Sequence, residues 1–179
     1  MKKLLKFAPI CALLLAIVAL VLVFATHGMT YETTLLGQKV TAWYSGVAVL
    51  FGKGQYQAAV SGLGSGTADF DGKGAWNAML AFIFLAIALV ALLVSVLTIF
   101  VKIKALEKFG GLIALVAGGL LLVAGIFLFF TVPAFGAANE LNNTDGWALG
   151  AGWVIAAILG IIAGVVSAFP AVLAIVDKK

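Results

Sequence analysis

Four long runs of the chain contain no charged side chain, and they limit the possible folds more than any other feature. The runs span about residues 7–25, 76–101, 109–132 and 147–176. At 1.5 Å per residue, a helix of each length is about as long as the hydrocarbon layer of a membrane is thick, about 30 Å. The chain is 64% hydrophobic and 10% charged, which is more apolar than a soluble domain. The sequence predicts an all-α membrane protein, with residues 1–179 forming a single integral domain around a four-transmembrane-helix bundle.

The first apolar run has two interpretations. It follows the lysine-rich start Met1–Lys6, and Val23 and Ala25 suit the cleavage site of a secretory signal peptide. Its 19 residues exceed the usual apolar core of about 7–15 residues in such signals. We therefore expect a retained helix. Cleavage would instead leave three spans and place the new N-terminus on the outer side.

Residues 26–74, between the first two runs, have the pattern of β-structure. Polar and apolar residues alternate over Lys39–Phe51, which predicts a strand. Gly52-Lys53 is typical of a two-residue hairpin turn, and Gln55–Val60 would return as the partner strand. We expect a small extracellular antiparallel β-sheet in this first outer loop.

The other connections are shorter or richer in glycine. A strand over Thr30–Leu36 is expected beside the hairpin, whereas Ser61–Gly74 contains five glycines and predicts a flexible connector. Lys102–Lys108 predicts a tight turn between antiparallel helices. Residues 133–146 predict a short second outer loop, because Pro133 is typical of a position just after a helix.

The distribution of lysine predicts the orientation in the membrane. Eight lysines flank the side that carries both termini, and three lie on the other side. The eight are Lys2, Lys3, Lys6, Lys102, Lys104, Lys108, Lys178 and Lys179. Because basic residues are enriched in cytoplasmic loops, we expect a multi-pass protein of the plasma membrane with both termini in the cytoplasm. The chain has no arginine, which argues against nucleic acid as a partner and leaves the lipid bilayer and other membrane proteins.

Glycines at helical spacing predict where helices approach each other. Gly146 with Gly150 and Gly160 with Gly164 form two GxxxG pairs in the fourth run, and Gly118 lies in the third. Small residues let helix backbones come close together in lipid. The pattern is explained either by packing within one bundle or by a face for self-association or for another membrane protein.

The sequence contains no constellation that predicts catalysis or metal binding. The four runs lack the acidic, basic and histidine side chains that membrane enzymes and ion-coupled transporters use, so we expect no enzyme, no catalytic residue and no cofactor. His27 with Glu32 supplies too few ligands for zinc. Asp69–Gly72 resembles the opening of a calcium loop but lacks its later glutamate. Asn142–Thr144 is a glycosylation sequon that matters only in a eukaryotic cell.

Aromatic residues of the outer loop are the candidate interaction surface. They are Trp43, Tyr44, Phe51, Tyr56 and Phe70. Some are expected to cover the helix ends or to form a small core for the sheet, and the rest would make a patch for another protein.

Two resemblances follow from these features. Four spans, internal termini and a long strand-rich first loop resemble the claudin-like four-transmembrane topology; Trp43 and Gly46 echo the claudin-type loop, whose Gly-Leu-Trp motif and paired cysteines are absent here. The lysine-rich start and the Trp43–Gly52 segment are similar to small uncharacterised four-span membrane proteins of Gram-positive bacteria. Both resemblances imply an architecture and carry over no functional residue.

We therefore expect a non-enzymatic integral membrane protein. Its role would be structural or accessory, through protein contacts made by the extracellular sheet and the glycine-rich helix faces. The alternative is a small channel or transporter subunit that conducts through an interface lined by backbone and hydroxyl groups.

Overall fold

The computed structural model describes residues 7–101, 104–141 and 144–176. Within these residues, four helices are long and apolar enough to span a membrane. They are α2 (Ala8–Ala25), α4 (Trp76–Phe100), α5 (Lys104–Phe129) and α7 (Ala151–Val176). The predicted combination of four candidate membrane helices with a small antiparallel sheet is confirmed.

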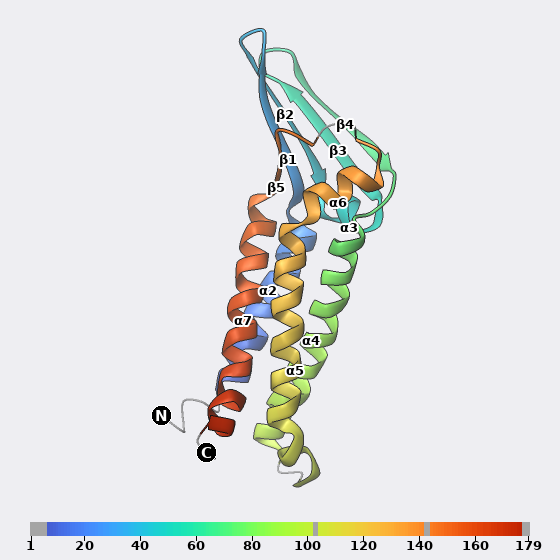
Figure 1. Ribbon diagram of the computed structural model, residues 1–179. Helices are drawn as coiled ribbons and strands as arrows, with labels where there is room; N and C mark the ends of the chain where they lie inside the picture. Colours follow the sequence, from blue (N-terminus) through green and yellow to red (C-terminus); the bar gives the residue numbers. More distant parts are fainter. Residues whose placement is uncertain (1–6, 102–103, 142–143, 177–179) are drawn as a thin grey trace.

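The sheet stands at one end of the helix bundle, and the start of α2 and the end of α7 lie at the other (Figure 1). In the bundle, α2 packs against α7, α7 against α5 and α5 against α4. Helix α4 in turn packs against α2. Small residues line these contacts. A Cβ added at Gly118 would lie 2.7 Å from the main-chain oxygen of Gly164, so the backbones of α5 and α7 touch there. The Ser167 hydroxyl of α7 donates a 2.7 Å hydrogen bond to the Ala114 carbonyl of α5 in the same contact.

The described strands form a five-stranded sheet in the order β4-β3-β2-β1-β5. Their bounds are β1 (His27–Leu35), β2 (Gln38–Ser45), β3 (Lys53–Val60), β4 (Gly64–Asp71) and β5 (Trp147–Leu149). Every neighbouring pair is antiparallel. The segment between α2 and α4 thus supplies four strands, and a segment before the last helix adds the fifth.

The strand predicted over Lys39–Phe51 is wrong in its second half, where the short helix α3 (Gly46–Phe51) replaces it. The Ser45 hydroxyl accepts a hydrogen bond from the Ala48 amide and so caps this helix. A Cβ at Gly46 would overlap the main-chain oxygen of Val23, so only glycine lets the chain turn across the end of α2. Gly52, expected in a hairpin turn, instead ends α3 with a φ of 75°.

The prediction of a flexible connector is also wrong, because most of that segment forms β4. Glycines at 62 and 64 have φ values of 83° and 108° and turn the chain back from β3. The returning strand then pairs with all eight residues of β3, from Val60–Gly64 to Lys53–Asp71. Backbone hydrogen bonding to β3, which the glycine-rich composition does not reveal, orders this segment.

The second half of the chain departs from the predicted boundaries in three places. The third helix begins at Lys104, inside the segment predicted as a tight turn, because the residues that follow are good helix formers. The third helix ends at Phe129, and α6 (Thr131–Ala138) follows within the predicted loop, with Pro133 in its first turn, where the missing N–H costs little. The fourth helix begins only at Ala151, after β5.

Gly146 and Gly150 therefore flank β5 and do not form a helical GxxxG pair. Gly146 has a φ of 83°. The Gly150 amide donates a 3.0 Å hydrogen bond to the Gly28 carbonyl, and a Cβ at Gly150 would overlap the His27 carbonyl oxygen. Backbone geometry at the sheet requires glycine at both positions. The predicted helix therefore does not extend over them.

Several sequence predictions concern residues outside the described part of the chain. These are the lysines at 2, 3, 6, 102, 178 and 179 and the sequon asparagines at 142 and 143.

Candidate interaction site

Tyr44 lies at the centre of an aromatic cluster between the sheet and α6. Its ring centroid is 4.9 Å from those of Tyr56 and Phe70, 5.0 Å from that of Phe135 and 5.2 Å from that of Trp147. We call these five residues the aromatic core. Tyr44 is 9% exposed, so it belongs to the core and is removed from the candidate surface.

The aromatic core brings together residues from four strands and one helix. Tyr44 and Tyr56 are direct partners across β2 and β3, so their side chains lie on one face of the sheet. Phe135 comes from α6 and covers that face. No local pattern marked Phe135 or Trp147 as members, because both lie more than 60 residues after the end of β4, in regions predicted as loop and helix, respectively.

The two remaining predicted aromatics lie elsewhere. Trp43 points to the other face of the sheet, where the His27 imidazole stacks on its ring with centroids 4.0 Å apart and an interplanar angle of 13°. Phe51 ends α3 and packs 6.5 Å from Phe24 and 5.9 Å from Phe82, so it covers the ends of α2 and α4. Of the predicted set, only Trp43 contributes to an open sheet face.

The face of the sheet that carries Trp43 is polar. Alternation along the strands directs residues to this face, and we call ten of them the polar sheet face. They are Thr30, Glu32, Lys39, Thr41, Trp43, Gln55, Gln57, Ser65, Thr67 and Asp69. Each is exposed or half-buried. Lys39 and Glu32 form a 2.8 Å ion pair, with side chains 59% and 64% exposed, and such exposed pairs add little stability.

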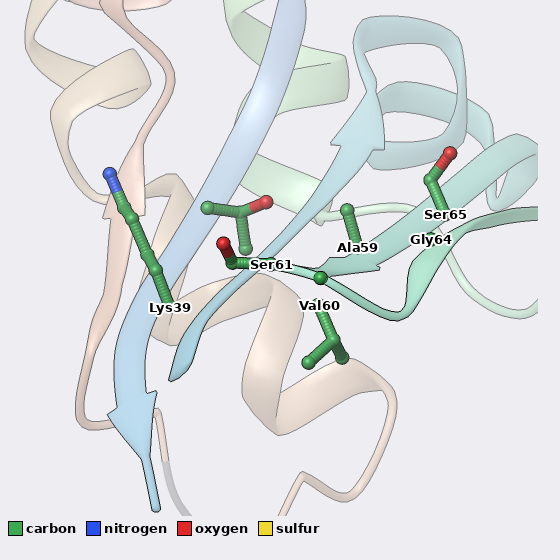
Figure 2. A pocket seen from close by; sticks show the side chains of 8 residues that line it. Lys39, Ala59, Val60, Ser61, Gly64 and Ser65 are labelled. Carbon is green, nitrogen blue, oxygen red and sulfur yellow. The ribbon is translucent and has the colours of Figure 1, made fainter. Parts of the chain in front are cut away.

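A shallow hollow of about 370 Å³ lies at the far end of this face. Lys39 and Thr41 of β2 line it together with Ala59–Ser61 and Ser65 around the β3–β4 turn. Figure 2 shows Val60 pointing to the opposite side of its strand from Ala59, as the alternation requires. An amine and several hydroxyls provide hydrogen-bonding groups here.

Side-chain amides and hydroxyls join segments at the base of the sheet. The Asn139 side chain closes a two-way bridge with the backbone of Lys73: its Oδ1 accepts from the Lys73 amide and its Nδ2 donates to the Lys73 carbonyl, both at 2.8 Å. On the other side, the Ser45 hydroxyl also accepts from the Gln55 amide at 3.1 Å, joining β2 to β3. These bonds link the segment after β4 to the end of α6 and link β2 to β3.

Tyr44 in the aromatic core has a shifted pKa. Burial, and secondarily the neighbouring Tyr56, raise the pKa of Tyr44 above its ordinary value, so its phenol stays neutral. Among the described residues no group of three or more His, Cys, Asp or Glu side chains is placed to hold a metal ion. The His27 ring stacks on Trp43, and Glu32 forms an ion pair with Lys39. His27 and Glu32 are therefore not brought together as a pair.

Comparison of the chain with protein-family models gives no match, and comparison with curated proteins gives none either. The claudin-like and Gram-positive four-span resemblances therefore stay predictions.

Proposed function

We propose that this chain is a non-enzymatic membrane protein with a structural or accessory role, which holds its sheet outside the plasma membrane to contact another protein. The bilayer would surround α2, α4, α5 and α7. The excess of lysine at the ends of the chain supports cytoplasmic termini and an extracellular sheet.

One observation carries this proposal: the sheet is packed against other side chains on one face and open on the other. The aromatic core and the Asn139 bridge fix its position. The polar sheet face lies on the opposite side, with Gln55, Thr67 and Asp69 exposed. A preorganised surface loses little conformational entropy when it binds, and this favours recognition as the purpose of the sheet.

Photo-crosslinking in native membranes tests the proposal. A photoreactive amino acid at position 57 lies on the polar sheet face, whereas the same group at position 58 lies on the opposite face. We expect one protein to be captured in stoichiometric amount from position 57 and not from position 58. Equal capture from both positions, or a lone monomer by mass photometry after gentle solubilisation, would contradict an interaction role.

No observation favours the channel or transporter alternative. Two buried polar side chains of the helices bond within the bundle: Asn77 Nδ2 donates to the Phe127 carbonyl at 3.0 Å, and the Ser167 hydroxyl donates to the Ala114 carbonyl. Thr98 bonds the Ser95 carbonyl of its own helix at 2.6 Å. These hydroxyls and amides act in packing, and flux assays in proteoliposomes are the direct test of conduction.

A further inference from the structure

β4 forms one edge of the sheet. It pairs with β3 along all eight residues without a register shift, and no described strand pairs with its other side. In an antiparallel strand, alternate residues direct their N–H and C=O groups to opposite sides. About half of the backbone groups of β4 are therefore directed outward, where an added strand would bond them.

The edge lacks most of the features that usually prevent strand addition. Natural edge strands are blocked by bulges, prolines, charged side chains (lysine above all) or short length. Gly64–Asp71 has no proline, no lysine and no bulge, and its only charged side chains are Asp69 and Asp71, which repel an acidic strand and attract a basic one. By contrast, the opposite edge strand, Trp147–Leu149, has only three residues. The two edges of the sheet thus differ, and only β4 offers a full strand length.

The side chains of β4 specify the chemistry of a neighbouring strand. Gly66 and Ala68 lie on the same face as the aromatic core, and no atom lies within 4 Å of the place where a Cβ on Gly66 would be. Small residues at these positions leave room for large apolar side chains from the next strand. On the other face Asp69 is exposed, has Gln55 as its cross-strand partner, and forms no ion pair within the described residues. A basic side chain on the added strand would complement it.

A second copy of this chain does not meet these requirements. The strands rise away from the helices (Figure 1). Two copies in one membrane are related by rotation about the membrane normal, so their β4 strands point the same way. This relation excludes antiparallel pairing of β4 with β4. Moreover β4 carries no basic residue, so β4–β4 pairing gives Asp69 no partner of opposite charge.

We propose that the outer edge of β4 binds an extended segment of another polypeptide by strand addition, with large apolar side chains beside Gly66 and Ala68 and a basic side chain beside Asp69. This inference rests on the proposed interaction role and names its partner's chemistry. Main-chain hydrogen bonds supply the affinity in this mode, and the alternate side chains supply the specificity.

The experiment uses the full chain in nanodiscs and synthetic peptides as probes. One peptide alternates valine, isoleucine and tyrosine with threonine and carries a single lysine on the threonine side; a second has glutamate in place of the lysine. We expect the lysine peptide to slow hydrogen exchange of β4 amides. Asp69→Lys should weaken binding of the lysine peptide roughly three- to tenfold and should favour binding of the glutamate peptide instead. Glu140→Lys, the same charge change in an exposed loop, should alter neither.

Proline substitutions separate binding at the edge from loss of the fold. Of Thr67→Pro and Ala68→Pro, one removes an outward N–H and the other removes an N–H that faces β3. The variant that lacks the outward N–H should prevent the peptide from slowing hydrogen exchange of the β4 amides, whereas the β3 amides should stay protected from exchange. Unchanged exchange of β4 with every peptide, or peptide preference unaffected by Asp69→Lys, would overturn the inference. If β4 binds no peptide while position 57 still captures a stoichiometric protein, strand addition fails and the proposed interaction role stands.

Discussion

The indole N–H of Trp153, in the first turn of α7, donates a 3.0 Å hydrogen bond to the main-chain oxygen of Val23, in the last turn of α2. The final carbonyls of a helix have no partner within the helix, and an apolar surrounding makes an unpaired carbonyl costly. Trp153 is fully buried, so this bond joins two distant helices at the level where the sheet begins.

Trp153→Phe should destabilise the fold by about 1–3 kcal/mol, because the Val23 carbonyl loses its buried partner. Chemical unfolding in detergent micelles or nanodiscs measures the change. Trp76→Phe is the matched control, since Trp76 is 61% exposed and should tolerate the change. Equal stability of the two variants would show that the Trp153 bond adds nothing.

Neighbouring glycines of α5 should respond in opposite ways to a larger side chain. Gly118→Leu is expected to push α5 and α7 apart, since a Cβ at Gly118 already lies 2.7 Å from the Gly164 carbonyl oxygen. Gly119→Leu should leave the bundle intact, because no atom lies within 4 Å of its added Cβ. Thermal stability and a disulfide-trapped distance between α5 and α7 report the difference. A Gly118 variant as stable as the Gly119 variant would contradict this contact.

Leu36 occupies a turn position that favours other residues. It has a φ of 51° and a fully exposed side chain in the β1–β2 turn, next to Gly37 with a φ of 78°. Asparagine tolerates this left-handed conformation better than leucine does, so Leu36→Asn should stabilise the protein by about 1 kcal/mol. Leu35→Asn, in the adjacent strand, is the control and should give no such gain. The melting temperatures of the two variants decide the matter.

Alkaline pH should destabilise the aromatic core through Tyr44. Its pKa is raised in the folded protein, so the neutral phenol stabilises the fold below the unfolded-state pKa of about 10, and this contribution is lost as pH rises through the folded-state pKa. Tyr44→Phe should therefore lose less stability between neutral and strongly alkaline pH than the unchanged protein. Phenolate absorbance, followed together with unfolding, checks this, and an identical alkaline loss in both proteins would contradict it.

The local pattern predicted much of the fold but missed contacts between distant segments. Continuous apolarity sufficed to locate the four helices, and alternation sufficed for the strand that ends at Ser45. Gly46 and Gly150 looked like parts of a strand and of a helix, respectively. Each instead lies where another backbone approaches too closely for a Cβ, which only the assembled structure reveals.

The candidate site was predictable in composition but not in arrangement. The five aromatic residues between the first two apolar runs are readable from the sequence, yet Tyr44 became core and Trp43 stayed on the open face because consecutive strand residues point to opposite sides. Which side became core was decided by Phe135 of α6, far away in the chain.

The sequence by itself determined the four apolar helices, because lipid-spanning length and the absence of charge are local properties of the chain. Only the tertiary structure decided that 64–71 is an ordered edge strand, that 147–149 joins the sheet, and that one sheet face is covered and the other open. These outcomes depend on hydrogen bonds and packing between segments far apart in sequence, whose free energy no local pattern records.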